Sequence, residues 1–414
     1  MCPQCGRRIA VDSRFVKWCE HCNWNLDASK PEPKSRRQLR REEAARRKGV
    51  DLFEELKNRQ PTKPGVSQAR VAAFALALAI HAFTLAVFLS SALVLITNFG
   101  TFFGFVVGGF LILFAVLIHP RFGGVKAGTV ILPREAAPSL YGLADRVAVE
   151  LGGKPIDLIT LDGRYNAGYG QLGLRRRRVL TIGLPLWNVL DDQQRIALLG
   201  HELAHQVNGD LAEITVVSAA LRTLDAWYRA LSPGPWQPGS GSIFAFFETI
   251  GQLLARGIYR VLRLIVEIIF RLEESLLFAS GRRAEYYADR LAARIASSEA
   301  TIAMLDTFYL DRPCLLTLRF ASRRDEGDVW AAERTFLAEI SPKEWERLRR
   351  LDAIRGAGID DTHPPTNLRI ELLRAQPPES ARIQLTNSES TAIAAEMASG
   401  YSLVGERIAA RFGS

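Results

Sequence analysis

The chain has 414 residues, of which 48% are hydrophobic and 23% are charged, and these fractions exclude a wholly disordered protein. The apolar residues are concentrated in two runs, 71–96 and 102–118. The first run contains a single ionisable side chain, His81, and the second contains none. Since a helix of roughly 20 residues crosses a bilayer, a purely soluble protein is not expected.

The formal net charge of +9 arises mostly in residues 30–70, which hold 13 Lys or Arg and six Asp or Glu. This segment directly precedes the first apolar run, where positive charge keeps a segment in the cytoplasm and attracts anionic lipids. The loop between the two runs is uncharged, and Arg121 and Lys126 follow the second run. We therefore expect a two-span hairpin at 71–119 in the inner or plasma membrane, with the N-terminus and the later residues cytoplasmic. Nucleic acid is not an expected partner.

Four of the five cysteines form two C-x-x-C pairs, Cys2 with Cys5 and Cys19 with Cys22, which flank a basic and strand-like stretch. Two such pairs about 14 residues apart have the ligand spacing of a four-thiolate structural zinc site. We predict a zinc ribbon at residues 1–27 that docks a protein partner or has a purely structural role. A redox-active C-x-x-C pair or four unconnected thiols are the alternative interpretations.

The hydrophobic periodicity after the hairpin predicts a small sheet inside a mostly helical domain of residues 120–375. The expected elements in chain order are a basic linker of helix-forming composition at 28–70, the hairpin, strands at 128–132 and 156–161 around a helix at 137–151, paired strands at 165–172 and 178–182, and a helix at 193–208. The paired strands join across an arginine run, Arg175 to Arg178, which we expect to be a lipid-facing or solvated turn. The predicted fold class is mainly α with a small β-sheet (α+β).

The helix predicted at 193–208 contains the sequence His-Glu-Leu-Ala-His, from His201 to His205. Histidines four residues apart share one face of a helix, where both imidazoles can bind one Zn²⁺. Glu202 then points toward the metal-bound water as a general base. An amphipathic helix with two surface histidines is the alternative interpretation.

A catalytic zinc site needs a third protein ligand and leaves its fourth position to water. The candidate is Glu285, in a helix predicted at 281–296. Asp289 lies one turn further on the same face, so its carboxylate can hydrogen-bond the outer nitrogen of a zinc-bound histidine. Acidic pairs at this spacing are more often solvated, and the assignment therefore depends on the histidine motif.

Three motifs, in this order after an apolar hairpin, resemble those of the HtpX-type membrane zinc metalloproteases and their relatives, the CAAX prenyl endopeptidases. The motifs run from His201 to His205, from Glu285 to Asp289, and from His363 to Ile370. The resemblance covers about residues 70–375 and includes Asn166 and Ala167, which match an edge-strand Asn-Ala of the family. It implies a zincin-like endopeptidase with its site at the cytoplasmic face of the membrane.

The resemblance implies metal-assisted peptide hydrolysis, with a catalytic zinc on His201, His205 and Glu285 and with Glu202 as the base. Together with the ribbon, this gives two expected zinc ions, one catalytic and one structural. His363 is the candidate donor to the oxyanion, and a packing role at a helix entry is its alternative.

The strand around Asn166 and Ala167 would hold the substrate as an added strand. Main-chain hydrogen bonds read little sequence, so broad specificity for unfolded segments would follow. The expected function is quality control of misfolded or exposed membrane-protein segments. The alternatives are a catalytically silent scaffold that recruits partners through the ribbon, and a CAAX-type processing protease. The presence of Glu202 counts against the scaffold, because a silent protein has no chemical need for this base.

Two further segments, 211–231 and 243–280, stand where HtpX-type enzymes commonly have a second pair of spans. Both carry charged residues, and in the second segment these form one polar stripe on an otherwise apolar helix. We therefore expect amphipathic or membrane-associated helices there, and spanning is the alternative. The tail at 376–414 has helix-forming composition and no assigned role.

Overall fold

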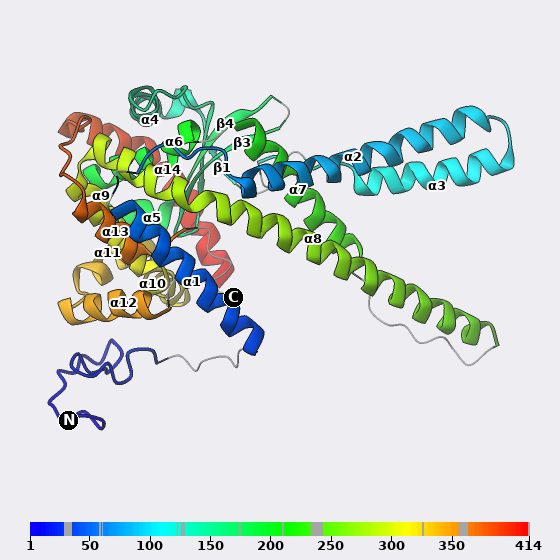
Figure 1. Ribbon diagram of the computed structural model, residues 1–414. Coiled ribbons are helices and arrows are strands. Elements are labelled where there is room, and N and C mark those ends of the chain that lie inside the picture. Colours follow the sequence, from blue (N-terminus) through cyan, green and yellow to red (C-terminus); the bar gives the residue numbers. More distant parts are fainter. Residues whose placement is uncertain are drawn as a thin grey trace.

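The computed structural model describes residues 1–28, 35–57, 59, 61–121, 123–125, 129–173, 175–208, 211–232, 243–324, 327–355 and 363–412. The helices and strands run from one end of the described chain to the other with a single small sheet near the middle (Figure 1). In chain order they are α1 (Arg36–Lys57), α2 (Gln68–Thr97), α3 (Phe102–Ile118), β1 (Val130–Leu132), η1 (Arg134–Ala136), α4 (Pro138–Glu150), β2 (Leu158–Asp162), β3 (Ala167–Leu172), β4 (Arg177–Gly183), α5 (Leu184–Val189), α6 (Asp192–Asn208), α7 (Leu211–Ala230), α8 (Ile243–Ala296), α9 (Ser298–Thr307), η2 (Phe308–Leu310), α10 (Asp311–Arg323), α11 (Val329–Ala338), α12 (Pro342–Arg355), α13 (Thr366–Ala375) and α14 (Asn387–Phe412).

The sheet has the strand order β1-β2-β4-β3, with β2 and β4 parallel and the other two pairs antiparallel. Because β4 inserts between β2 and β3, β3 becomes an edge strand. The chain crosses the end of β4 closely, and Gly183 donates its amide to the Asn166 carbonyl at 2.8 Å. A Cβ at Gly183 would lie 2.0 Å from the Arg164 carbonyl oxygen, so glycine is needed there. This crossing fixes the start of the edge strand.

The main hydrophobic core lies between the sheet and helices α4, α6, α8, α9 and α14. The C-terminal helix α14 belongs to this core: Met397 and Val404 are buried, and Gly400 lies against Leu161 of β2. Glu396 of α14 also accepts hydrogen bonds from the first amides of α4, at 2.8 and 2.9 Å. Residues after 376 are therefore part of the folded domain that surrounds the sheet.

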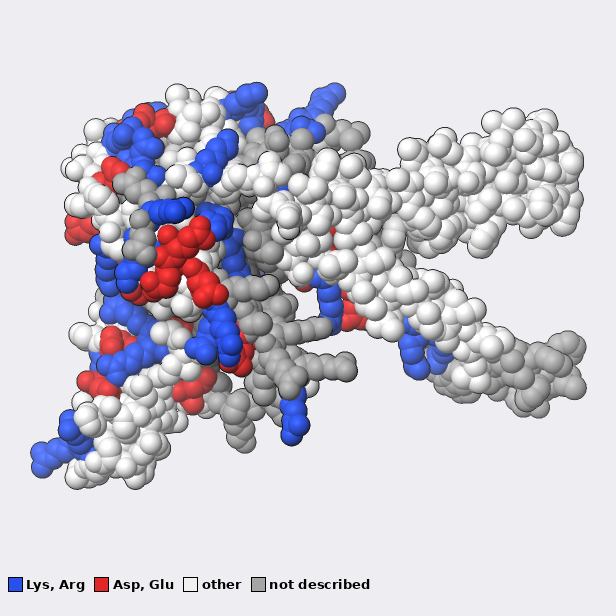
Figure 2. Space-filling model, viewed as in Figure 1, with Lys and Arg blue, Asp and Glu red and all other residues white. Residues whose placement is uncertain are grey.

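Two helical arms project from this body, one formed by α2 and α3 and the other by α7 with the first part of α8 (Figure 1). Beyond Arg70 in the first turn of α2, the α2–α3 arm has no Lys, Arg, Asp or Glu and exposes large apolar side chains, whereas charged residues are frequent on the body (Figure 2). In the described part of the chain, α2 alone is long and apolar enough to cross a membrane, since α3 has only 17 residues. The helical hairpin is present, and its crossing of the membrane by both helices stays a prediction.

The second arm packs against the first through a small apolar cluster that includes Ala77 of α2, Ala220 of α7 and Val266 of α8. Its charged residues are partly paired within the arm: Arg263 donates to the Tyr228 hydroxyl at 2.7 Å, and Arg271 pairs with Glu267. The amphipathic helices expected at 211–231 and 243–280 are thus present as α7 and most of α8.

The basic segment before the hairpin is not a free linker where the structure describes it. Phe53 and Leu56 of α1 are buried against Tyr286 of α8 and Leu372 of α13. Arg283 of α8 donates to Glu55, and Arg290 donates to the Pro61 carbonyl at 2.6 Å. The segment therefore packs across α8, the helix that carries Glu285. Residues 29–34, 58 and 60 of the predicted linker lie outside the described residues.

The expected α+β class, with mainly helices and a small mixed sheet, is confirmed. One local prediction was wrong. The stretch between the cysteine pairs forms turns and no strand within residues 1–28, because each pair closes its own tight turn. The helix predicted at 281–296 is the end of the 54-residue α8, since no residue between the two segments breaks the helix. The short helix α5 was not predicted. Residue 128 of the first predicted strand lies outside the described residues.

Candidate active site and cysteine cluster

Helix α6 lies against the C-terminal part of α8, and this contact brings three potential metal ligands together. His201 and His205 are one turn apart on α6, and Glu285 extends from α8. One ligand atom from each residue lies within 4.8 Å of the other two. Gly200 permits the close approach, because an added Cβ would lie 3.1 Å from the Cα of Ala292. The structure thus brings Glu285 to the two histidines, the nearer of which, His205, is 80 positions away in the chain.

The carboxylate of Glu285 is surrounded by imidazoles. Its oxygens lie 3.5 Å from Nε2 of both His201 and His205, and Oε2 lies 2.5 Å from Nδ1 of His363. Burial acts to raise the pKa of Glu285, but the neighbouring imidazoles lower it well below its usual range. Burial likewise opposes a charge on His201, yet its hydrogen bonds to Asp289 and Glu285 raise its pKa to about 10. The site therefore stabilises a buried carboxylate that attracts positive charge.

Asp289 and Arg369 form a buried pair behind these side chains. Oδ1 of Asp289 lies 3.0 Å from Nδ1 of His201, which leaves Nε2 facing Glu285. Arg369 of α13 is 1% exposed and donates to both Asp289 oxygens, at 2.6 and 2.8 Å. Burial acts to raise the pKa of Asp289, and the guanidinium outweighs it, so that the pKa falls to about 2. Asp289 is therefore held ionised and pointed at His201.

The role of Arg369 was not recognised from the sequence. This residue lies inside the third motif, which extends from His363 to Ile370, but the motif does not distinguish it from a surface arginine. The available signal is its position among Ile370, Leu372 and Leu373, which are all buried on α13. A charged residue on a buried helix face requires a partner of opposite charge.

Glu202 lies between the three potential ligands and the edge strand. It is 8% exposed, and its Oε2 accepts a hydrogen bond of 3.1 Å from the amide of Tyr169. Outward-facing amides alternate along a paired strand, so those of Ala167 and Gln171 point the same way as that of Tyr169. The Ala167 amide binds the side-chain oxygen of Asn166 at 2.9 Å. Glu202 thus faces the edge of β3 that pairs with no other strand of the described sheet.

His363 lies at the mouth of the same cluster. Its side chain is 43% exposed, and its ring centroid lies 6.2 Å from that of His201. The contact between its Nδ1 and Glu285 holds the imidazole ring of His363 beside the three potential ligands. The structure therefore brings His363 to the site, and its expected role as oxyanion donor stays a prediction.

The donor set of His201, His205 and Glu285 fits a catalytic zinc ion. Two imidazole nitrogens and one carboxylate oxygen are a ligand set of catalytic zinc, which keeps a further position for water or substrate. The contact between Asp289 and the outer nitrogen of His201 is the usual support for a metal-binding histidine, because it fixes the tautomer and the ring orientation. Nothing in the donor chemistry of this cluster conflicts with zinc.

The four N-terminal cysteines form a second cluster, whose sulfur atoms all lie within 4.8 Å of one another. The two C-x-x-C turns have the same backbone pattern. The carbonyl of Cys2 accepts from the Gly6 amide at 3.0 Å, and that of Cys19 accepts from the Asn23 amide at 2.9 Å. Gly6 and Asn23 both have a positive φ, of 71° and 57°. The arrangement is compatible with the predicted zinc ribbon, in which each turn supplies two thiolates.

This N-terminal module is docked on the body of the protein through α12. Trp18 is 1% exposed, and the charged groups of Lys343 and Arg350 lie 5.8 and 5.4 Å from the centre of its ring. Buried Arg347 donates to the carbonyl of Leu26 at 3.0 Å. The aromatic residue thus serves an intramolecular interface, which agrees with the structural role expected for the module.

Comparison with known proteins gives a consistent set of relatives. Peptidase family M48 matches residues 143–376, which include all three motifs but neither the cysteine cluster nor α2 and α3. A protease HtpX homolog from Pyrobaculum calidifontis is 27% identical over 249 residues, which are 58% of this chain and 68% of that protein. Homologs from Bacillus licheniformis and Bacillus subtilis are 25% and 27% identical, and each match covers 43% of this chain and 57% of the relative. No solved structure matches the chain.

Proposed function

The chain belongs to peptidase family M48 and is an HtpX-like zinc metalloendopeptidase, and from this premise we propose that it hydrolyses misfolded or exposed segments of membrane proteins on the cytoplasmic side. The observation that carries the proposal is the grouping of His201, His205 and Glu285 around one point, with Glu202 between them and an open strand edge. This geometry joins a metal-binding group, a base and a place for an extended peptide.

In the proposed mechanism His201, His205 and Glu285 hold the catalytic zinc, which would acidify a water molecule and polarise the scissile carbonyl. Glu202 accepts the proton of the attacking water and passes it to the leaving amine. The Tyr169 amide, 3.1 Å from Glu202 Oε2, keeps this carboxylate beside the strand edge. Asp289 and Arg369 hold the ring of His201 in place during the reaction.

The proposed substrate is an extended segment that pairs with β3. The outward amide of Gln171 provides a main-chain hydrogen bond, the Ala167 amide adds one by exchanging the Asn166 side chain for the substrate, and the Tyr169 amide holds Glu202. An added Cβ at Gly168 or Gly170 would meet no atom within 4 Å, so the strand face at these two positions is open. Such pairing requires that the substrate is locally unfolded, and it depends only weakly on the amino-acid sequence of the substrate. This supports a role in quality control, in which the substrate is defined by its exposed backbone.

The proposed membrane topology places both ends of the α2–α3 hairpin on one side. Glu55 and Pro61, which precede α2, contact Arg283 and Arg290, which follow α3. Contacts between the two flanks require that the chain crosses the membrane an even number of times between them. The basic composition of the preceding segment then favours the cytoplasm for both flanks and for the active site.

The test compares the native chain with Glu202→Gln, both purified in detergent, for bound zinc and for cleavage of an unstructured protein. We expect the variant to keep its zinc, because Glu202 is not a proposed ligand, and to lose cleavage by more than about 100-fold. Glu299→Gln is the matched control, since Glu299 is an exposed residue of α9 outside the site, and it should cut at the native rate.

The same experiment can overturn the proposal. If Glu202→Gln cuts as fast as the native chain, the base is wrongly assigned. If neither form cuts with saturating zinc, while zinc is bound at the cysteine cluster alone, a catalytically silent scaffold becomes the better interpretation.

A further inference from the structure

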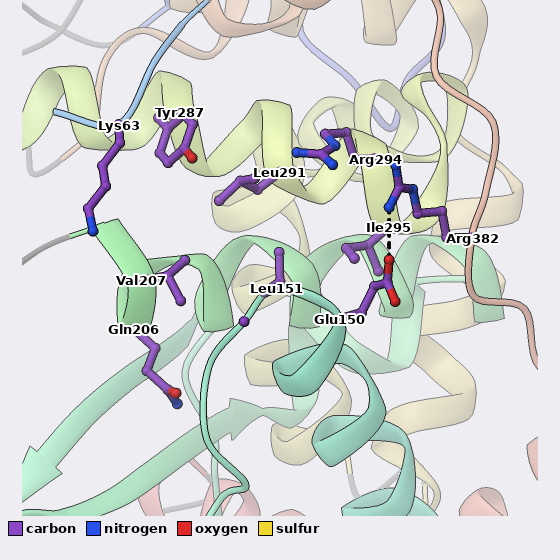
Figure 3. A pocket seen from close by; sticks show the side chains of 11 residues that line it. Lys63, Glu150, Leu151, Gln206, Val207, Tyr287, Leu291, Arg294, Ile295 and Arg382 are labelled. Carbon is purple, nitrogen blue, oxygen red and sulfur yellow. Dashed lines mark hydrogen bonds and ion pairs between the residues drawn. The ribbon is translucent and has the colours of Figure 1, made fainter.

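Two adjoining hollows lie on the surface behind the proposed zinc helix. The first, of about 640 Å³, is bounded by α6, α8 and the turn after α4 (Figure 3). The second, of about 690 Å³, lies beneath the β3–β4 turn. They share Gly152, Gln206 and Val207, so they form one continuous depression, which we call the basic trough. None of the proposed zinc ligands lines it, and it adjoins the proposed substrate strand only at Gln171.

The walls of the trough are strongly basic. Its two acidic residues are already paired: Glu150 accepts from Arg382 at 2.9 Å, and Asp157 accepts from Arg178 at 2.6 Å. In the described part of the chain, the remaining cations have no carboxylate partner. They are Lys63, Lys154, Arg175, Arg176, Arg177 and Arg294. A depression with several unneutralised cations attracts an anion with more than one charged oxygen.

The β3–β4 turn holds three of these cations at the surface. Arg175, Arg176 and Arg177 are all exposed. Arg176 has a φ of 49° and Gly173 a φ of 68°, as in a tight turn, and Arg177 is the first residue of β4. Three adjacent guanidinium groups repel one another, and an anion between them would relieve this repulsion.

The trough also lies close to both ends of the apolar hairpin. The Gly173 amide donates to the carbonyl of Gly123 at 3.1 Å, and Gly123 follows α3 by five residues. On the other side, Lys63 lines the trough and precedes α2 by five residues. The basic trough is thus tied to the points where the chain enters and leaves the hairpin. If the hairpin is in a membrane, these points lie at the level of the lipid headgroups.

We propose that the basic trough binds the phosphate headgroup of an anionic phospholipid. Arginine side chains contact phosphate oxygens through paired N–H groups, and lysines add charge without fixed geometry. Position selects the source of the phosphate, because a headgroup is delivered at this height by the bilayer itself, whereas a soluble phosphate has no such concentration there. The proposal does not depend on peptide hydrolysis, and it is tested without it.

The experiment measures the thermal midpoint of the full-length chain in detergent, in the Glu202→Gln background that prevents self-cleavage. Mixed micelles with increasing phosphatidylglycerol are compared with micelles containing phosphatidylcholine, and a third series contains inorganic phosphate. We expect phosphatidylglycerol alone to raise the midpoint. The triple substitution R175Q/R176Q/R177Q should require roughly 100-fold more phosphatidylglycerol, because each of the three charges near a lipid surface contributes separately.

The matched control R7Q/R8Q/K17Q removes three positive charges from the N-terminal module, which lies far from the hairpin (Figure 1), and should respond like the parent. K63Q/R294Q alters the other end of the trough and should weaken the response as well. The proposal is overturned if R175Q/R176Q/R177Q responds like the parent, or if phosphatidylcholine is equally effective. An equal effect of inorganic phosphate would identify a soluble anion as the ligand and would also overturn the lipid assignment. Unchanged zinc content shows that each variant is folded.

Discussion

The two candidate metal clusters of this protein are built in opposite ways. The four cysteines come from one stretch of 21 residues, and each pair is shaped by its own turn, closed by a hydrogen bond to the carbonyl of Cys2 or Cys19. The cluster of His201, His205 and Glu285 depends on the packing of α6 on α8 and has no local turn to form it. The first cluster can therefore form wherever the short segment folds, whereas the second exists only in the complete domain.

The cluster that depends on the complete domain is also the more buried of the two at its core, around His201. Two of the cysteines are partly exposed, and the module that contains them touches the body mainly through α12. At the second cluster, His201 is 1% exposed and is supported by Asp289 and Arg369, which are equally buried. We therefore expect a closed structural site at the N-terminus and a supported site with an open position in the body. The following experiments test this contrast.

The largest expected effect is that of Glu285→Gln. Removing the charge of a proposed ligand should release the catalytic zinc and reduce cleavage by more than about 100-fold, since even outer-shell changes typically cost 10- to 100-fold. Metal analysis should show a fall from about two zinc ions per chain to about one. The cysteine cluster should keep its zinc. Loss of both ions, or of neither, would contradict the independence of the two sites.

Asp289→Asn should have the next largest effect. The variant leaves the three proposed ligands intact but weakens the contact with His201 and leaves Arg369 without an ionised partner. We expect zinc affinity, measured by competition with a chelator, to fall by about 10- to 100-fold. Asp306→Asn is the matched control, because it breaks an ion pair with Arg349 near the surface and away from the site. Equal affinities of the two variants would show that Asp289 does not position His201.

Cys19→Ser should have a small effect on catalysis. It removes one thiolate from the N-terminal cluster, so one zinc ion should be lost and residues 1–28 should become sensitive to protease. Cleavage of an unstructured substrate should stay within about threefold of the native rate, because distant sites contribute independently. A large loss of cleavage would mean that the module, through α12, supports the active site.

The last prediction concerns two buried glutamates and leaves cleavage unchanged, because it appears only in the pH dependence of stability. Glu285 is kept ionised by its histidine neighbours, whereas burial raises the pKa of Glu333 to about 8, despite a hydrogen bond of 2.9 Å from Asn188. A carboxyl whose pKa is raised on folding stabilises the protein below its unfolded pKa, and this contribution is lost as pH rises through 8. The native chain should therefore lose about 1 kcal/mol of unfolding free energy per pH unit between about pH 5 and 8 from this group. Glu333→Gln should remove that slope in thermal melts, and an unchanged slope would show that Glu333 is ionised throughout.

Much of the active site was predictable because its residues follow local rules. Two histidines four positions apart must share a helix face, and the acidic residue four positions after Glu285 must lie on the same side as Glu285. The pairing of β3 with β4 was predicted from two strand-like runs around a turn, and the edge position of β3 was expected only from the family resemblance. Arg369 was not recognised, because an arginine in a helix sequence has no feature that reveals a buried carboxylate 80 residues away.

The sequence by itself determined which atoms are available as ligands, which helix faces they occupy, and where the apolar hairpin lies, since these properties depend on neighbours within a few residues. Tertiary structure decided the rest. The insertion of β4 between β2 and β3 made β3 an edge strand. The basic segment that precedes the hairpin packs, through α1, against Tyr286, and Trp18 packs against α12. These features depend on contacts between segments that are distant in the chain. The free energy of such contacts cannot be inferred from the pattern of neighbouring residues.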